Sequence, residues 1–161
     1  METTMKFINF TQHNLTEEQV AAAREMGATE IVDAKSVLAN FAEIANDDGN
    51  VDAVRQANEI AKAIAALAGK EPAFIHFPIS SPRVQAAFWR QFEYWGYPSY
   101  ADIHSEDYEM WKQVRKHRFV FSHTARVSQD VPQPDGSVKK TTTFRFEKFI
   151  ELKIENRIEV Q

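Results

Sequence analysis

Apolar and polar positions repeat with two different periods along this chain. Short runs rich in β-forming residues predict strands over 6–10, near 31–32 and over 73–79. Between them, apolar positions recur every three or four residues, which predicts helices over 16–26, 37–44, 52–68 and 82–95, and a shorter one over 102–114. This order of elements predicts an α/β fold, with a Rossmann-like and mostly parallel sheet.

Local signals support several of these boundaries. Thr16 to Gln19 reads "TEEQ", a capping box in which the Thr16 hydroxyl and the Gln19 side chain each bond a free backbone amide. Gly27 is expected to end this first helix. Ser81 and Pro82 are typical of a helix cap and first turn. The nearly continuous apolar run from Ala73 to Ile79 favours a strand that is covered on both faces.

In the C-terminal third, apolar positions alternate with polar ones, which is the spacing typical of strands. Two β-rich runs flank "PQPDGS", in which Asp135-Gly136 is a hairpin turn signal. We therefore expect an antiparallel hairpin over about 117–152, appended to the sheet. We find no linker or repeat, so residues 1–161 are predicted to form a single domain.

Composition narrows the class of protein. Hydrophobic residues make up 43% and charged residues 26%, as in ordinary globular proteins, and no apolar run is long enough to span a bilayer. The first residues lack the layout of a signal peptide, and the absence of cysteine excludes disulfides and thiolate chemistry. We expect a cytoplasmic protein that does not bind membranes.

Charge is unevenly distributed. Between Lys112 and Lys148 nine Lys and Arg oppose three acidic residues, which gives +6, so the rest of the chain carries −10 of the net charge of −4. A net negative charge disfavours binding to long nucleic acids, whereas the basic segment could attract a small phosphorylated ligand. The alternative is a hairpin whose charges only keep it solvated.

Small polar residues follow two predicted strands, where ligands bind in open α/β sheets. The first group comprises Thr11, Gln12, His13 and Asn14, and the second comprises Phe77, Ser80 and Ser81. Each group leads into a helix N-terminus, which favours phosphate. The same residues could act only as turns and caps. If the two strands are neighbours, the two loops share one edge.

Several kinds of chemistry lack their sequence signals. No GxGxxG or GxxxxGK[ST] loop occurs, so side chains such as those of Arg126 and Arg145 would have to meet phosphate charge. No metal-ligand spacing occurs, and we expect neither a metal nor a cofactor. Ser80, Ser81, His13 and His123 have no spacing that indicates a hydrolase, so no catalytic residue is predicted. His76, inside an apolar strand, is expected to be buried and hydrogen-bonded.

Two stretches carry a family resemblance. "NFTQHNLTEEQ" near the start and "FSHTARVSQDVPQPDGSVKKTTTFRFEKFIEL" near the end resemble the first-described phage Thoeris anti-defence sponges. The resemblance implies a decorated Rossmann-like fold that sequesters, without catalysis, cyclic ADP-ribose isomers made by bacterial TIR-domain immune enzymes. Some members also hold cyclic trinucleotides. It further implies a ligand bound at a subunit interface of a dimer or a larger oligomer such as a hexamer.

The resemblance also implies roles for individual residues. Thr11, His13 and Asn14 match the N-terminal motif, and Arg126, Phe144 and Arg145 match the hairpin motif. We expect the arginines to bind phosphates, an aromatic side chain to stack on adenine, and His13 and Asn14 to bond ribose or base. The predicted ligand set is completed by Ser122 and His123, at the start of the hairpin.

Three other functions stay open at this point. The N-terminal motif is also similar to CRISPR-associated sensors of cyclic oligoadenylates. An enzyme that cleaves a cyclic nucleotide, with His13 or His123 as acid or base, is a second alternative. A third is an interaction protein whose basic hairpin contacts another protein.

Overall fold

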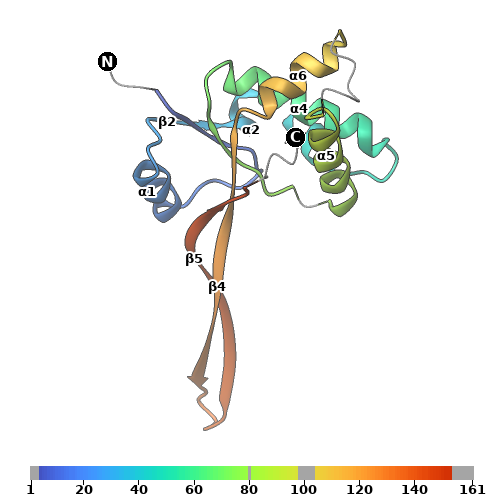
Figure 1. Cartoon of the computed structure of the whole chain (residues 1–161). Helices are drawn as coiled ribbons and strands as arrows, with labels where there is room; N and C mark the ends of the chain where they lie inside the picture. Colours follow the sequence, from blue (N-terminus) through green and yellow to red (C-terminus); the bar gives the residue numbers. More distant parts are fainter. Residues whose placement is uncertain (1–3, 80, 98–103, 154–161) are drawn as a thin grey trace, which may run out of the picture.

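The fold is built on one five-stranded sheet. The computed structural model describes residues 4–79, 81–97 and 104–153, and its strand order is β2-β1-β3-β4-β5 (Figure 1). The strands are β1 (Lys6–Asn9), β2 (Glu30–Asp33), β3 (Phe74–His76), β4 (Arg118–Pro132) and β5 (Val138–Glu151). The first four are parallel and β5 is antiparallel to β4, so the predicted fold class is confirmed.

Six helices accompany the strands in the described part of the chain. They are α1 (Glu17–Glu25), α2 (Ala34–Val37), α3 (Phe41–Ala45), α4 (Ala53–Ala68), α5 (Pro82–Tyr94) and α6 (Glu106–Val114). The single helix expected over 37–44 was wrong, because Leu38 adopts extended backbone angles and separates α2 from α3. None of the described helices combines the length and apolar character needed to cross a bilayer.

Helices cover the sheet on both faces. Phe7, Phe74 and Val120 point toward α1, where they pack with Ala23 of that helix. The alternate strand positions point to the opposite face, into a larger core shared with α3, α4, α5 and α6. Figure 1 shows α1 on one side of the sheet and these helices on the other. The short strand β3 is buried along its whole length, as its apolar sequence predicted.

The predicted helix signals act as expected at several ends. The capping box of α1 has both bonds, from Gln19 N–H to the Thr16 hydroxyl and from Thr16 N–H to Gln19 Oε1. Gly27 has a φ of 109°, which favours glycine at this helix end. Ser81 caps α5, and Pro82 is its first residue. In α4 the apolar residues that recur at helical spacing mostly face the core, whereas Val54 in the first turn lies exposed.

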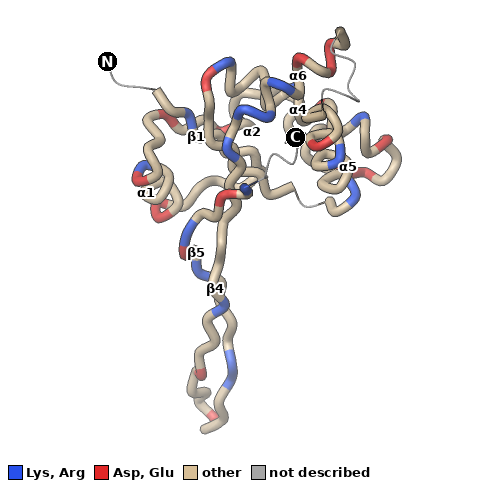
Figure 2. The backbone as a smooth tube through the Cα atoms, in the orientation of Figure 1, with Lys and Arg blue, Asp and Glu red and all other residues tan. Residues whose placement is uncertain are grey.

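The hairpin extends far beyond the sheet. Strand β4 pairs with β3 as far as Val120, and beyond that point β5 is its only strand partner among the described residues. Figure 1 shows the two strands leaving the body as a long ribbon, and Figure 2 shows Lys and Arg along it. Its turn contains Gly136 at a φ of 82°, as the Asp-Gly signal predicted.

Candidate functional site

The two polar strand ends lie at the same edge of the sheet. Strands β1 and β3 are parallel neighbours, with Asn9 opposite His76, so the condition for a shared edge is met. Because β4 is parallel to both, its extension into the hairpin also leaves from this edge, which we call the carboxyl edge. The candidate site therefore comprises two strand-to-helix loops and the root of the hairpin.

The β1–α1 loop is held by polar contacts. The buried Thr11 hydroxyl accepts the His13 N–H at 3.3 Å, and Gln12 Nε2 donates to Asn46 Oδ1 at 2.9 Å. Lys35 Nζ donates to the Gln12 carbonyl at 3.2 Å and also to Asn14 Oδ1. The exposed side chains of His13 and Asn14 are thus presented by an ordered loop, with the ammonium group of Lys35 beside them.

The β3–α5 loop contributes less than the sequence predicted. Phe77 is 0% exposed and packs against Phe10 and Phe88, so it presents no surface to a ligand. Ser80 lies outside the described residues. Ser81 is partly buried, and its hydroxyl accepts the Val84 N–H as the cap of α5.

An internal carboxylate already occupies the start of α5. The Ser81 hydroxyl donates to Asp47 Oδ2 at 2.6 Å, and Arg83 binds both oxygens of Asp47 through Nε and Nη2 at 2.6 and 2.5 Å. The bonds from Arg83 and Ser81 hold the pKa of the Asp47 carboxyl well below its usual range. A phosphate could bind here only by displacing this carboxylate, which makes the β1–α1 side of the edge the better candidate.

The last row of strands β2, β1 and β3 is polar. Asp33, Asn9 and His76 are the final residues of their strands and lie side by side in register. Asn9 Nδ2 donates to Asp33 Oδ1 at 3.0 Å and to the His13 carbonyl at 2.8 Å, while Asn9 Oδ1 lies 2.9 Å from His76 Nδ1. We did not predict this row as a site. The sequence feature that could have indicated this row is the polar residue at the end of the strand sequences "KFIN" and "FIH".

Ser122 and Gln19 continue this network onto the hairpin and α1. Ser122 Oγ lies 2.9 Å from His76 Nε2 and accepts a hydrogen bond from Gln19 Nε2 at 3.0 Å. Because both amide protons of Asn9 are used elsewhere, its oxygen must face His76, so we assign the imidazole proton to Nδ1. Nε2 then carries the lone pair, and the Ser122 hydroxyl donates to it.

His76 is buried and satisfied, as the sequence predicted. It is 4% exposed, and burial lowers its pKa from 6.5 to about 4. Phe7 stacks on the imidazole with ring centroids 6.0 Å apart, and Phe149 meets it edge-on at 5.3 Å. The ring is therefore neutral at pH 7 and held in one orientation.

The hairpin places its candidate residues on two different faces. Arg126 and Phe144 are cross-strand partners and share a face, on which Phe144 is 74% exposed. Arg145, the next residue along β5 and the partner of Ala125, points to the other face. His123 lies nearer the body, with its Nε2 3.5 Å from a carboxylate oxygen of Glu147.

The loops and the hairpin cations do not meet within one chain. Among the described residues, no hydrogen bond or ion pair joins Arg126 or Arg145 to the β1–α1 or β3–α5 loop. The ribbon instead points away from the body (Figure 2). The arginines that the sequence assigned to phosphate are therefore not carried over the loops of their own chain, because continued pairing keeps β4 and β5 extended.

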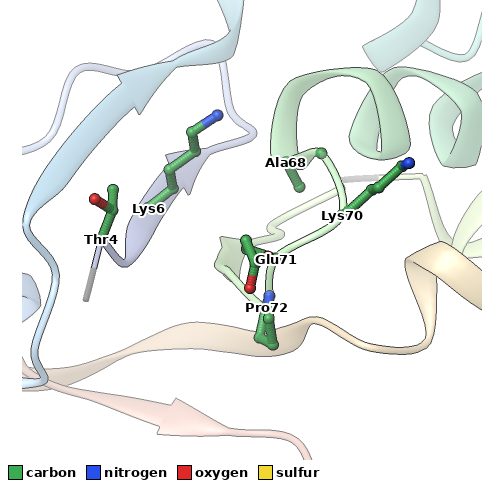
Figure 3. Close-up of a pocket in the computed structure, with 7 residues that line it drawn as sticks. Thr4, Lys6, Ala68, Lys70, Glu71 and Pro72 are labelled. Atoms are coloured by element: carbon green, nitrogen blue, oxygen red, sulfur yellow. The ribbon is translucent and has the colours of Figure 1, made fainter.

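A pocket lies at the opposite, amino edge of the sheet. It is lined by residues at the start of β1 and by the α4–β3 connection, namely Thr4, Lys6, Ala68, Gly69, Lys70, Glu71 and Pro72 (Figure 3). Lys6 Nζ already donates to the Leu67 carbonyl at 3.3 Å. The polar row and the strand-end loops lie at the other end of the strands, so this pocket is separate from the candidate site.

Comparison with protein-family models, with curated proteins and with solved structures finds no match. Within the residues that the structure describes, no three His, Cys, Asp or Glu side chains are grouped as a metal site would require. The geometry of the carboxyl edge therefore carries the functional argument.

Proposed function

We propose that this protein binds and sequesters a small cyclic nucleotide signal, a cyclic ADP-ribose isomer or a cyclic trinucleotide, without cleaving it. It would thereby inhibit bacterial anti-phage defence in the cytoplasm of the host cell. The observation that carries the proposal is the shared edge, at which the polar β1–α1 loop and the basic hairpin both arise. Carboxyl edges of parallel strands are the usual place for nucleotides in such folds.

The hairpin supports the proposal through one pair of residues. Arg126 and Phe144 face the same side, so a guanidinium that can bind phosphate lies opposite an exposed ring that can stack on a base. Arg145 would meet a second phosphate only from the other face. On the body, His13, Asn14 and Lys35 offer donors for ribose, base or phosphate.

The separation of these groups supports a site shared between copies. Arg126 is four residues beyond Ser122, so it lies roughly 13 Å farther out along β4. A partner chain could bring its hairpin over the β1–α1 loop and enclose a ligand between Arg126 of one copy and His13 of the other. Enclosure slows release, which sequestration requires. We therefore propose a homo-oligomer, a dimer or a larger assembly such as a hexamer.

Calorimetry against a panel of cyclic nucleotides tests the proposal. At least one cyclic ADP-ribose isomer or cyclic trinucleotide should bind and be recovered intact after heat denaturation of the complex. Arg126→Ala should weaken that binding by about 2–4 kcal/mol, or roughly 30- to 1,000-fold in Kd, because a phosphate loses its charged partner. Lys139→Ala, which removes a cation near the tip, is the matched control and should change Kd little.

Two results would contradict the proposal. Absence of heat for every nucleotide in the panel would favour an interaction protein. Recovery of a linear product instead of the intact ring would show a cyclic nucleotide hydrolase.

A further inference from the structure

We propose that Ser122 is an activated nucleophile, which His76 and Asn9 prepare to accept an acyl group from a small carboxylic ester. This reaction goes beyond the proposed function and does not depend on it, because a cyclic nucleotide of the proposed kind offers no carboxylic ester. The inference comes from the polar network at the carboxyl edge, in which the three residues occupy the positions of nucleophile, base and orienting group.

The first requirement is a hydroxyl whose proton points at a free base. Ser122 Oγ lies 2.9 Å from His76 Nε2, within the range for proton transfer. The assigned tautomer leaves the lone pair on Nε2, so the hydroxyl proton already lies on the path that it would follow. His76 is neutral at pH 7, so Nε2 is unprotonated in essentially every molecule. The same burial lowers the pKa of the ring to about 4 and makes it a weaker base than free imidazole, so acylation of Ser122 should be slow and should need an ester with a good leaving group.

The second requirement is that the base cannot turn away. His76 Nδ1–H donates to Asn9 Oδ1 at 2.9 Å, and Asn9 itself is fixed through Asp33 and the His13 carbonyl. Phe7 and Phe149 restrain the ring from two directions. Cys-His-Asn proteases use the same order of nucleophile, base and amide, so an amide in the third place is compatible with catalysis.

The third requirement is a donor for the negative charge that develops on the substrate. Gln19, in the first turn of α1, donates one amide proton of Nε2 to Ser122 Oγ at 3.0 Å, so the donor that we assign to the substrate oxygen is the second proton of the same amide. Its other amide atom, Oε1, is engaged by Thr16 N–H, so the NH₂ group is directed toward Ser122. The N-terminus of α1 adds a favourable dipole at the same place. Ser122 is only partly buried, so a small ester can reach it.

Acylation of Ser122 needs no reactant other than the ester, and release of the acyl group needs only water. Ser122 Oγ attacks the ester carbonyl carbon while its proton passes to His76 Nε2. The bond to the leaving oxygen then breaks, and His76 returns the proton to the departing alcohol. The products are an acyl ester of Ser122 and a free alcohol. Water activated by His76 in the same way releases the carboxylic acid and restores Ser122.

The full-length chain incubated with p-nitrophenyl acetate tests this inference. We expect a burst of p-nitrophenol and, by peptide mass spectrometry, one acetyl group per chain on Ser122. Ser122→Ala should lower the burst at least tenfold. Ser128→Ala is the matched control, since it removes an exposed hydroxyl farther along the same strand and should leave the burst unchanged.

Unfolding the chain distinguishes acetylation that needs the folded geometry around Ser122 from the unspecific acetylation of exposed side chains. In urea the selectivity for Ser122 should disappear, because the geometry at His76 is lost. The inference is overturned if the folded chain carries acetyl groups only on lysines or the N-terminus, or if Ser122→Ala shows the same burst. Failure here would leave the nucleotide calorimetry unaffected, so the two proposals are tested separately.

Discussion

His76 illustrates how neighbouring residues fix the state of a single side chain. An imidazolium at this position would lose solvation inside the sheet, and burial therefore lowers its pKa to about 4. His117 is also buried, accepts the Ala73 N–H at Nδ1, and has its pKa lowered to about 4, chiefly by burial. Both histidines are neutral in the folded protein at pH 7.

Stability should fall as the pH drops from about 6.5 toward 4. In the unfolded chain these two histidines bind protons near their ordinary pKa of 6.5, whereas in the folded chain they do so only near 4. The unfolded state therefore takes up more protons in this window, which costs roughly 2 kcal/mol of stability per histidine between pH 7 and pH 5. Urea denaturation at the two pH values measures this difference. Equal stabilities at pH 7 and pH 5 would contradict the conclusion that His76 and His117 are buried and neutral in the folded protein.

At the scale of elements, α1 has a role beyond covering the sheet. Its N-terminal residues form the capping box, and Gln19 extends from that box to Ser122 on β4. One side chain thus links a local helix signal to the polar row across 103 residues of sequence. The entry of α1 and the root of the hairpin are therefore held together.

Loss of the cap should destabilise the protein by a modest amount. Thr16→Ala removes the acceptor for the Gln19 N–H and should lower the free energy of unfolding by about 1 kcal/mol. Gln19→Ala should cost more than Thr16→Ala, because the bond to Ser122 is lost as well. Glu17→Gln changes only an exposed first-turn charge and serves as the control. Urea denaturation at pH 7 measures the free energy of unfolding of the three variants. An equal loss of stability in Thr16→Ala and Gln19→Ala would contradict a stabilising bond from Gln19 to Ser122.

For the whole molecule, the hairpin is the unusual feature. A two-stranded ribbon is marginally stable in water, and this one carries exposed apolar side chains, including Val138 at 63% and Phe144 at 74%. Its root is stabilised by Phe149, which packs on Phe7, and by Phe146, which contacts Phe149 at 5.0 Å. Beyond that root, contact with another copy would supply the packing that the ribbon lacks within its own chain.

Shortening the arm tests this view of assembly. Replacing residues 128–142 with Asn-Gly keeps Val127 opposite Thr143 and closes the strands with a favoured turn. The body should fold with a thermal midpoint within a few degrees of the full chain, but the mass measured by sedimentation should fall to that of a monomer. Pro134→Ala alters the tip at full length and should keep the assembled mass. A shortened chain that assembles like the full chain would show that the arm does not join the copies.

The sequence by itself determined the elements and their local ends. Three features depend on neighbours along the chain and could be predicted from spacing and residue type. They are the cap at Thr16, the turn at Gly136 and the fully buried strand β3. The sequence also indicated the parallel sheet and the appended hairpin. It failed at Leu38, where a break between two short helices has no strong local signal.

Only the tertiary structure decided which distant side chains meet. Asn9 and His76 are 67 residues apart, and Asp47 reaches Arg83 across 36. Their contacts depend on strand order and on loop packing, which no local pattern encodes. For the same reason the sequence could propose Arg126 as a ligand residue but could not tell that the ribbon carries it away from its own loops. Strand pairing keeps that arm extended, because the backbone groups that face the neighbouring strand are hydrogen-bonded across the ribbon.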